Sequence, residues 1–155
     1  MKLPTLAGPA RSRRNDAGME PLDLRNGRPR RARDEAGGIV FLPRSIDKVR
    51  AALPGGDLGE YTIEGFTSGM LGEFNISVAD FTEAVRRANT DDDVVAYVHQ
   101  HAKPGGIESW NDFATKREIY QGDRAEAIAD HPWLADHPEL VYSLDFLDYT
   151  EAHDL

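Results

Sequence analysis

Hydrophobic and polar positions follow a helical period along most of the chain beyond residue 40. The first clear case runs from Ser45 to about Leu53, where three apolar residues share one face at about 100° per residue: Ile46, Val49 and Leu53. Ser45 is a suitable N-cap, and a Pro-Gly-Gly sequence ends the segment. The pattern predicts a short amphipathic helix whose Asp47 and Lys48 point away from the apolar face.

The next segments predict further helices. A weaker helix is expected from about Phe66 to Phe74, and the two clearest helices follow it. Ser77 and Thr90 are each suited to cap a run of apolar residues with helical spacing, and a short connection separates the two runs. They predict an antiparallel αα-hairpin over about residues 77–101.

The last third of the chain adds one long helix and two shorter segments. Apolar residues with helical spacing mark the long helix: Ile107, Trp110, Phe113, Ala114 and Tyr120. Shorter segments are expected near 123–130 and 139–150. The quartet Ala-Asp-His-Pro occurs at 129–132 and at 135–138, which predicts two similar turns. Strand signal is nearly absent, so the predicted fold is mainly α, a single compact domain of five to seven helices.

The N-terminal residues 1–37 show no period and are rich in Arg, Pro and Gly. They predict an irregular basic arm on a helical domain of residues 38–155. Residues 1–18 are expected to be disordered or dispensable, and Met19 is a second candidate for the translation start beside Met1. The first 33 residues hold nine basic and three acidic residues, a net charge of +6. The rest of the chain holds nine basic and 24 acidic residues, a net charge of −15.

This asymmetry bears on the partners of the protein. A basic arm can contact nucleic acid, but this arm has no interleaved aromatic residues and the acidic body would repel phosphates. We therefore expect no nucleic-acid partner. The arm is expected to pack on the acidic surface or extend into solvent, with recognition of an acidic partner protein as the alternative. The chain has no cysteine, which suits the cytoplasm, and no apolar run approaches the roughly 20 residues of a membrane span.

Candidate chemistry concentrates at the start of the first predicted helix. Four charged residues lie within two turns: Arg44, Asp47, Lys48 and Arg50. Asp47 and Arg50 are three positions apart, a spacing at which the two side chains can pair. Two interpretations stay open. The group is either a structural ion-pair network that docks the helix, or a partly buried site in which Arg and Lys bind a carboxylate or phosphate.

Further candidates lie beyond this helix. Glu60 and Tyr61 follow a glycine-rich turn; Glu60 is a candidate acid/base if it is buried, and Tyr61 would position a substrate. Asn111, next to a tryptophan expected in the core, is a candidate ligand contact. The histidines near 131–137 and at 153 have acidic neighbours but lack the spacing typical of metal ligands. We therefore expect no metal and no cofactor.

Several of these pieces together resemble a family of small bacterial proteins known as domain of unknown function 5069. The resemblance covers roughly residues 21–150. It rests on several short motifs: Pro29-Arg30-Arg31, Leu42-Pro-Arg44, Asp47-Lys48, Arg50-Ala51, Gly59-Glu-Tyr61, Trp110-Asn111 and Ser143-Leu-Asp-Phe-Leu-Asp148. It implies a helical bacterial protein and implies no reaction.

Three functions are compatible with these patterns. The first is a cytoplasmic helical module that binds a small anionic ligand or partner near the first helix. The second is an enzyme that uses the same pocket, with Glu60 as acid/base. The third is a protein–protein adaptor whose arm recognises an acidic partner. A concave site lined by the charged residues would favour the first two.

Overall fold

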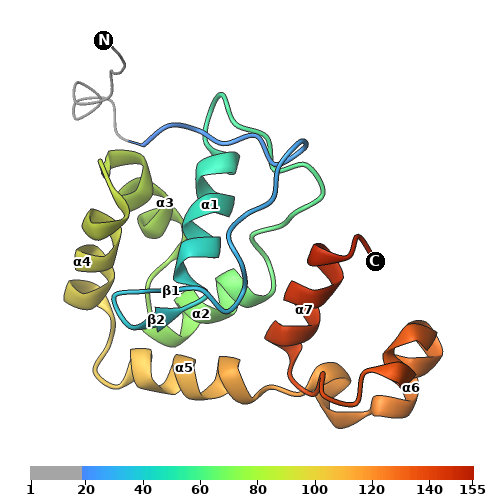
Figure 1. Cartoon of the computed structure of the whole chain (residues 1–155). Coiled ribbons are helices and arrows are strands. Elements are labelled where there is room, and N and C mark those ends of the chain that lie inside the picture. The colour runs from blue at the N-terminus through green and yellow to red at the C-terminus, as the bar shows by residue number, and fades with distance from the viewer. Residues whose placement is uncertain (1–18) are drawn as a thin grey trace.

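Helices make up most of the structure, a computed structural model that describes residues 19–155 (Figure 1). The predicted mainly α fold is confirmed. The predictions for residues 1–18, including the choice between Met1 and Met19 as the start, lie outside the described residues. Within the described part, none of the helices has the length and apolar character needed to cross a membrane.

The first helix, α1 (Leu42–Ala52), stands near the middle of the fold and begins one turn earlier than predicted. Pro43 lies in its first turn, where its missing N–H would have no helical partner and its fixed φ suits the helix. Ser45 is therefore an interior residue, and its hydroxyl hydrogen-bonds with that of Thr67 at 2.9 Å. The prediction that Ser45 caps this helix was wrong, because Phe41 occupies the N-cap position.

The three helices that follow agree with the sequence pattern. They are α2 (Phe66–Phe74), α3 (Val78–Arg87) and α4 (Asp91–His101). The Ser77 hydroxyl accepts a hydrogen bond from the backbone N–H of Asp80 at 3.0 Å, which caps α3 as predicted. A short connection joins α3 to α4, and the two pack together beside α1 (Figure 1). The predicted αα-hairpin is confirmed.

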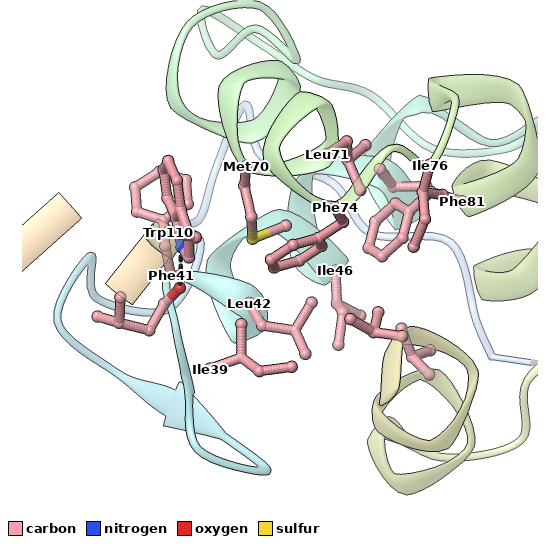
Figure 2. Close-up of a cluster of buried hydrophobic side chains, with 14 of the residues drawn as sticks. Ile39, Phe41, Leu42, Ile46, Met70, Leu71, Phe74, Ile76, Phe81 and Trp110 are labelled. Atoms are coloured by element: carbon pink, nitrogen blue, oxygen red, sulfur yellow. Dashed lines mark hydrogen bonds between the residues drawn. The ribbon is translucent and has the colours of Figure 1, made fainter. Parts of the chain in front are cut away.

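The main hydrophobic core lies where α1, α2, α3 and the chain before α1 meet (Figure 2). Its largest apolar side chains are fully buried: Ile39, Leu42, Ile46, Met70, Leu71, Phe74 and Phe81. Trp110, from α5 (Gly106–Lys116), belongs to the same cluster with 1% of its surface exposed. Its indole N–H donates to the carbonyl of Val40 at 2.9 Å. The expectation that this tryptophan is a core residue is confirmed.

A small antiparallel hairpin precedes α1. It pairs β1 (Glu35–Ala36) with β2 (Ile39–Val40). Gly37 and Gly38 both have positive φ, as a tight two-residue hairpin turn requires. A Cβ on Gly37 would also lie 2.2 Å from a methyl carbon of Val95 on α4, so this position needs glycine for space as well. The hairpin thereby packs against α4, and the chain continues from it directly into α1.

The C-terminal part is more broken than predicted. The long helix expected to include Tyr120 ends at Lys116, because Arg117 and Glu118 adopt extended backbone conformations. Tyr120 and Gln121, both left-handed, lie in the separate short 3-10 turn η2 (Ile119–Gly122). Next come α6 (Arg124–Asp130), the 3-10 turn η3 (Pro132–Asp136) and α7 (Ser143–Ala152). The repeated Ala-Asp-His-Pro quartets do form similar turns: φ and ψ are −134° and 78° at His131, and −129° and 66° at His137.

The described part of the basic arm packs against the helical body. It runs alongside α1 down to the β hairpin (Figure 1). The backbone N–H of Leu24 donates to the carbonyl of Asp57 at 2.8 Å, and that of Leu22 donates to the carbonyl of Arg50 at 3.3 Å. Three apolar residues of the arm are buried: Met19, Leu24 and Ala32. From residue 19 onward the arm has no helix and one two-residue strand, β1, and of the two expected dispositions it shows packing.

Candidate functional site

The polar side chains of α1 are buried, although the helical pattern predicts that Asp47 and Lys48 point outward. The exposed fraction is 1% for Arg44, 5% for Asp47 and 7% for Lys48. The arm and α7 cover the side of α1 that lies opposite its apolar face, through hydrogen bonds from Arg30 to Asp47 and from Arg44 to Glu151. The prediction was wrong because a helix in the middle of a fold has no solvent face.

Arg44 forms the most enclosed charged contact of this region. Its guanidinium makes a two-point ion pair with Glu151 of α7, with one N–H···O distance of 3.0 Å, and it donates to the carbonyl of Arg30 at 3.1 Å. Its Nε–H, however, is buried and has no hydrogen-bond partner. A buried charged donor without an acceptor is unusual in folded proteins, and it marks a place that an acceptor would satisfy.

Lys48 lies one turn further along α1 and has neither a hydrogen bond nor an ion pair within residues 19–155; its ammonium faces two aromatic rings. The Nζ atom is 5.5 Å from the ring centroid of Phe41 and 6.0 Å from that of Tyr61. The pKa of Lys48 falls from 10.5 to about 8. Burial is the largest cause and the positive charge of Arg44 adds to it, while Glu151 acts in the opposite direction.

The cations of Arg44 and Lys48 share the same aromatic walls. The guanidinium carbon of Arg44 is 5.9 Å from the Phe41 ring centroid and 5.6 Å from that of Tyr61. We call these four residues the Lys48 site. The Phe41 backbone has φ 73°, a left-handed conformation that is costly for a bulky residue and tends to occur at functional sites.

Asp47 and Arg50 belong to contacts that hold the arm onto α1. The Asp47 carboxylate accepts hydrogen bonds from the backbone N–H of Arg30 at 2.8 Å and from its guanidinium at 3.0 Å. Arg30 also pairs with Asp91 of α4, which together with Asp47 raises the pKa of its guanidinium. The Arg50 Nε–H donates to the carbonyl of Glu20 at 2.7 Å. The pairing that the spacing of Asp47 and Arg50 allows is not the one that Asp47 makes, because its carboxylate pairs with Arg30 of the arm.

Glu60 and Tyr61 line an open cleft of about 630 Å³ between the loop before α2 and residues 24–28 of the arm. Glu60 is exposed at this cleft, so it lacks the burial that an acid/base role presupposes. Tyr61 is partly buried, and desolvation together with the charge of Glu151 raises the pKa of its phenol. Tyr61 thus separates the cleft from the Lys48 site and contributes to both.

Asn111 is not brought to the Lys48 site. Its side-chain oxygen accepts a hydrogen bond from the backbone N–H of Val40 at 3.0 Å, and its amide donates to the carbonyl of Gly38 at 2.8 Å. Both partners lie in the β hairpin, so the Asn111 amide holds the hairpin to α5. A ligand contact for this residue stays a prediction, and the role that the structure displays is structural.

The C-terminal histidines lie in an aromatic cluster. The Tyr149 hydroxyl and His137 Nε2 are 3.0 Å apart, and His137 Nδ1 is 3.0 Å from the Glu139 carboxylate. The His153 ring stacks on Tyr149 with centroids 4.0 Å apart. Among residues 19–155 there is no group of three or more His, Asp or Glu placed to hold a metal ion.

Two residues were not anticipated from the sequence: Phe41 of the Lys48 site and Glu151, which pairs with Arg44. Phe41 reads as part of an apolar run before the first helix, and the ring contact with the cations depends on its left-handed backbone. Glu151 is 107 positions away from Arg44 along the chain. Arg44 and Lys48 could be identified as candidates from their residue types. Their proximity to the Glu151 carboxylate could not, because it depends on the packing of α7 beside α1.

Comparison with known proteins identifies the family of this chain. No curated protein matches the chain at a significant level. The motifs that carry the sequence resemblance include Arg44, Lys48 and Tyr61 of the site. A family model matches residues 26–152, nearly the whole described chain, and the chain therefore belongs to the family described as a domain of unknown function, DUF5069.

Proposed function

We propose that this chain is a binding module for a small anion and that the anion binds at the Lys48 site. The observation that carries the proposal is the buried Arg44 Nε–H, which lacks an acceptor. It lies on the same helix as Lys48, a residue that is 7% exposed and whose ammonium has no hydrogen bond or ion pair within the described residues. A buried donor that has lost water and gained no acceptor costs about 1–3 kcal/mol, and more when it is charged. A bound oxyanion would supply an acceptor to both groups.

The charge of the Lys48 site and its aromatic neighbours support a small monoanion. With Lys48 protonated, the charges of Lys48, of Arg44 and of the Glu151 carboxylate paired with Arg44 leave one net positive charge at the Lys48 site. A carboxylate or a singly charged phosphate ester would neutralise it. The rings of Phe41 and Tyr61 flank the two cations and suit a ligand with a short carbon skeleton.

Under this proposal, two of the four charged residues at the start of α1 form a structural ion-pair network and the other two form an anion site. Asp47 and Arg50 dock the arm, while Arg44 and Lys48 bind the ligand. The exposure of Glu60 gives the enzyme alternative no support. The family resemblance and the lack of cysteine are compatible with a bacterial, cytoplasmic protein, so we take the ligand to be a cytoplasmic metabolite.

Thermal unfolding in the presence of acetate, lactate and phosphate tests the proposal. An anion that binds the folded state stabilises it by RT ln(1 + [L]/Kd), about 2.7 kcal/mol at a hundredfold excess over Kd. We expect at least one of these anions to raise the melting temperature of the wild type. Because Lys48 is buried, Lys48→Met is the appropriate variant; it removes the charge and keeps most of the volume. The shift should disappear in this variant.

Lys116→Met provides a matched control. Lys116 carries the same side chain on the surface of α5, where it is 71% exposed and paired with Asp112. This variant should keep the anion-dependent shift of the wild type. The proposal fails if none of the anions stabilises the wild type, or if the shift survives Lys48→Met.

A further inference from the structure

We infer that the ligand of the Lys48 site is a small 2-oxo acid, and that Lys48 holds it through a reversible imine. The inference rests on the proposed function, because it uses the same anion site and adds a covalent bond to it. Its starting point is Lys48, a residue that is 7% exposed and whose amine has no hydrogen-bond or ion-pair partner within the described residues.

A nucleophilic amine must be neutral for part of the time. A lysine in an ion pair is held in its protonated form, but Lys48 faces aromatic rings and the cation of Arg44. With its pKa lowered to about 8, roughly a quarter of the amine is neutral at about pH 7.5, more than about a hundredfold above the fraction at the ordinary value of 10.5. The site therefore provides a nucleophile at neutral pH.

Arg44 supplies the second half of the recognition. Side chains four residues apart on a helix lie on the same face, with about 5–6 Å between their Cβ atoms. Glu151 and the carbonyl of Arg30 occupy the outer nitrogens of Arg44 and leave Nε–H as the donor without an acceptor. In a 2-oxo acid the carboxylate is bonded directly to the carbonyl carbon. A carboxylate at Arg44 therefore brings the carbonyl carbon within reach of Lys48.

The covalent step balances without an oxidant or reductant. The lone pair of the Lys48 nitrogen adds to the carbonyl carbon, and the carbonyl oxygen takes up a proton. That oxygen then leaves as water with a second proton, and the nitrogen keeps one hydrogen as the protonated imine. Overall, one amine, one 2-oxo acid and one proton give one protonated imine and one water. Tyr61, whose ring lies 6.0 Å from Lys48 Nζ and whose raised pKa keeps its hydroxyl protonated, is the neighbouring proton donor.

Reductive trapping with pyruvate tests this inference. Sodium borohydride reduces an imine between pyruvate and lysine to a stable carboxyethyl amine, which peptide mass spectrometry locates. We expect the label at Lys48 at an occupancy about tenfold or more above that at the exposed Lys103, because burial has made the Lys48 amine the more often neutral one. Lactate has the same charge and nearly the same size but no carbonyl, so it should give no label.

Lys48→Arg separates the covalent bond from anion binding. Arginine keeps a cation at this position but cannot form the imine, so trapping should vanish while stabilisation by lactate or phosphate persists. If anions stabilise the wild type through Lys48 but pyruvate and borohydride leave Lys48 unlabelled, the imine is refuted and the anion-binding function stands. If labelling is equal at Lys48 and Lys103, the imine is also refuted. A lack of stabilisation by any anion refutes the proposed function itself.

Discussion

At the scale of single residues, the Lys48 ammonium carries a desolvation cost that the rest of the fold must offset. The exposed fraction of the residue is 7%, and its pKa falls from 10.5 to about 8, with burial as the largest cause. A shift of this size corresponds to a cost on the order of 3 kcal/mol for keeping the charged form in the folded state at neutral pH. Such a cost is typical of groups retained for function rather than for stability.

Lys48→Met should therefore stabilise the free protein at pH 7 by up to about 3 kcal/mol, because an apolar side chain of similar length suits this environment. The stabilisation should shrink as the pH rises from 8 towards 10. In that range the unfolded wild type binds a proton at Lys48 that the folded wild type has released, so its stability rises with pH, whereas the variant has no such group. Urea unfolding of both proteins across this range measures the difference.

The neighbours of Lys48 do not reverse this sign. Arg44 and Glu151 form an ion pair with each other, and the raised pKa of Tyr61 delays its ionisation. Lys116→Met at the surface should change stability much less than Lys48→Met does. A Lys48→Met protein that is less stable than the wild type at pH 7 would show that the ammonium contributes favourably to the fold.

Arg44, Lys48 and Tyr61 could be selected as candidates from their residue types, but their environment could not be predicted. A helical wheel describes one apolar face and is silent about what covers the opposite one. Here the cover consists of the arm and of α7, which meet α1 over separations of 17 residues for Arg30–Asp47 and 107 for Arg44–Glu151. Contacts at such distances leave no periodic signal, so the burial of Lys48 could not be predicted.

At the scale of elements, α7 is joined to the arm as well as to α1. The Asp148 carboxylate, itself 7% exposed, accepts hydrogen bonds from the backbone N–H of Ala32 at 2.6 Å and of Arg33 at 3.1 Å. Two backbone N–H groups of the irregular arm thus donate to a single side chain of α7. This contact keeps α7, and with it Glu151, in place beside α1.

Asp148→Asn should loosen this junction. The amide group of asparagine offers one acceptor oxygen where the carboxylate offers two, and its NH₂ would face a backbone donor. We expect a loss of stability on the order of 1–3 kcal/mol, together with faster hydrogen exchange at the backbone amides of Ala32 and Arg33.

Asp145→Asn is the matched control for this prediction. Asp145 lies on the same helix and pairs with the Arg33 side chain, but 40% of its own side chain is exposed. The loss should therefore stay below about 1 kcal/mol, and exchange at Ala32 should be unchanged. Equal effects of the two substitutions would contradict a special role for Asp148.

The helices themselves were more predictable than their ends. The bounds of α2 and the hairpin of α3 and α4 follow from local periodicity and from the Ser77 cap, because both signals lie within a few residues. The predicted start of α1 lay too late in the sequence, because proline can begin a helix as well as end one, and Pro43 lies in the first turn. The end of α5 was missed because Arg117 and Glu118, where the chain becomes extended, are neither glycine nor proline and carry no helix-ending signal in the sequence.

At the scale of the whole molecule, the basic arm and the acidic body neutralise each other. The five arginines between residues 25 and 33 each form an ion pair with an aspartate: Arg25 with Asp23 and Asp57, Arg28 with Asp154, Arg30 with Asp47 and Asp91, Arg31 with Asp148, and Arg33 with Asp145. A phosphate backbone would have to compete with these carboxylates, most of which belong to the helical body.

Duplex nucleic acid should therefore not bind at physiological salt. The net charge of −15 on residues 34–155 opposes the +6 on residues 1–33, and at about 150 mM salt screening leaves only contacts within about 8 Å effective. The arginines of the described arm already have partners at that range. Fluorescence anisotropy of a labelled duplex, titrated with full-length protein, should show no saturable binding at about 150 mM salt and at most weak binding at low salt.

Sub-micromolar binding at about 150 mM salt would mean that the arm leaves the body to reach phosphate. Because Arg30 and Ala32 cover the side of α1 that holds Lys48, the anion site would then have to open at the same time, and nucleic acid would compete with the small anions that the Lys48 site is proposed to bind.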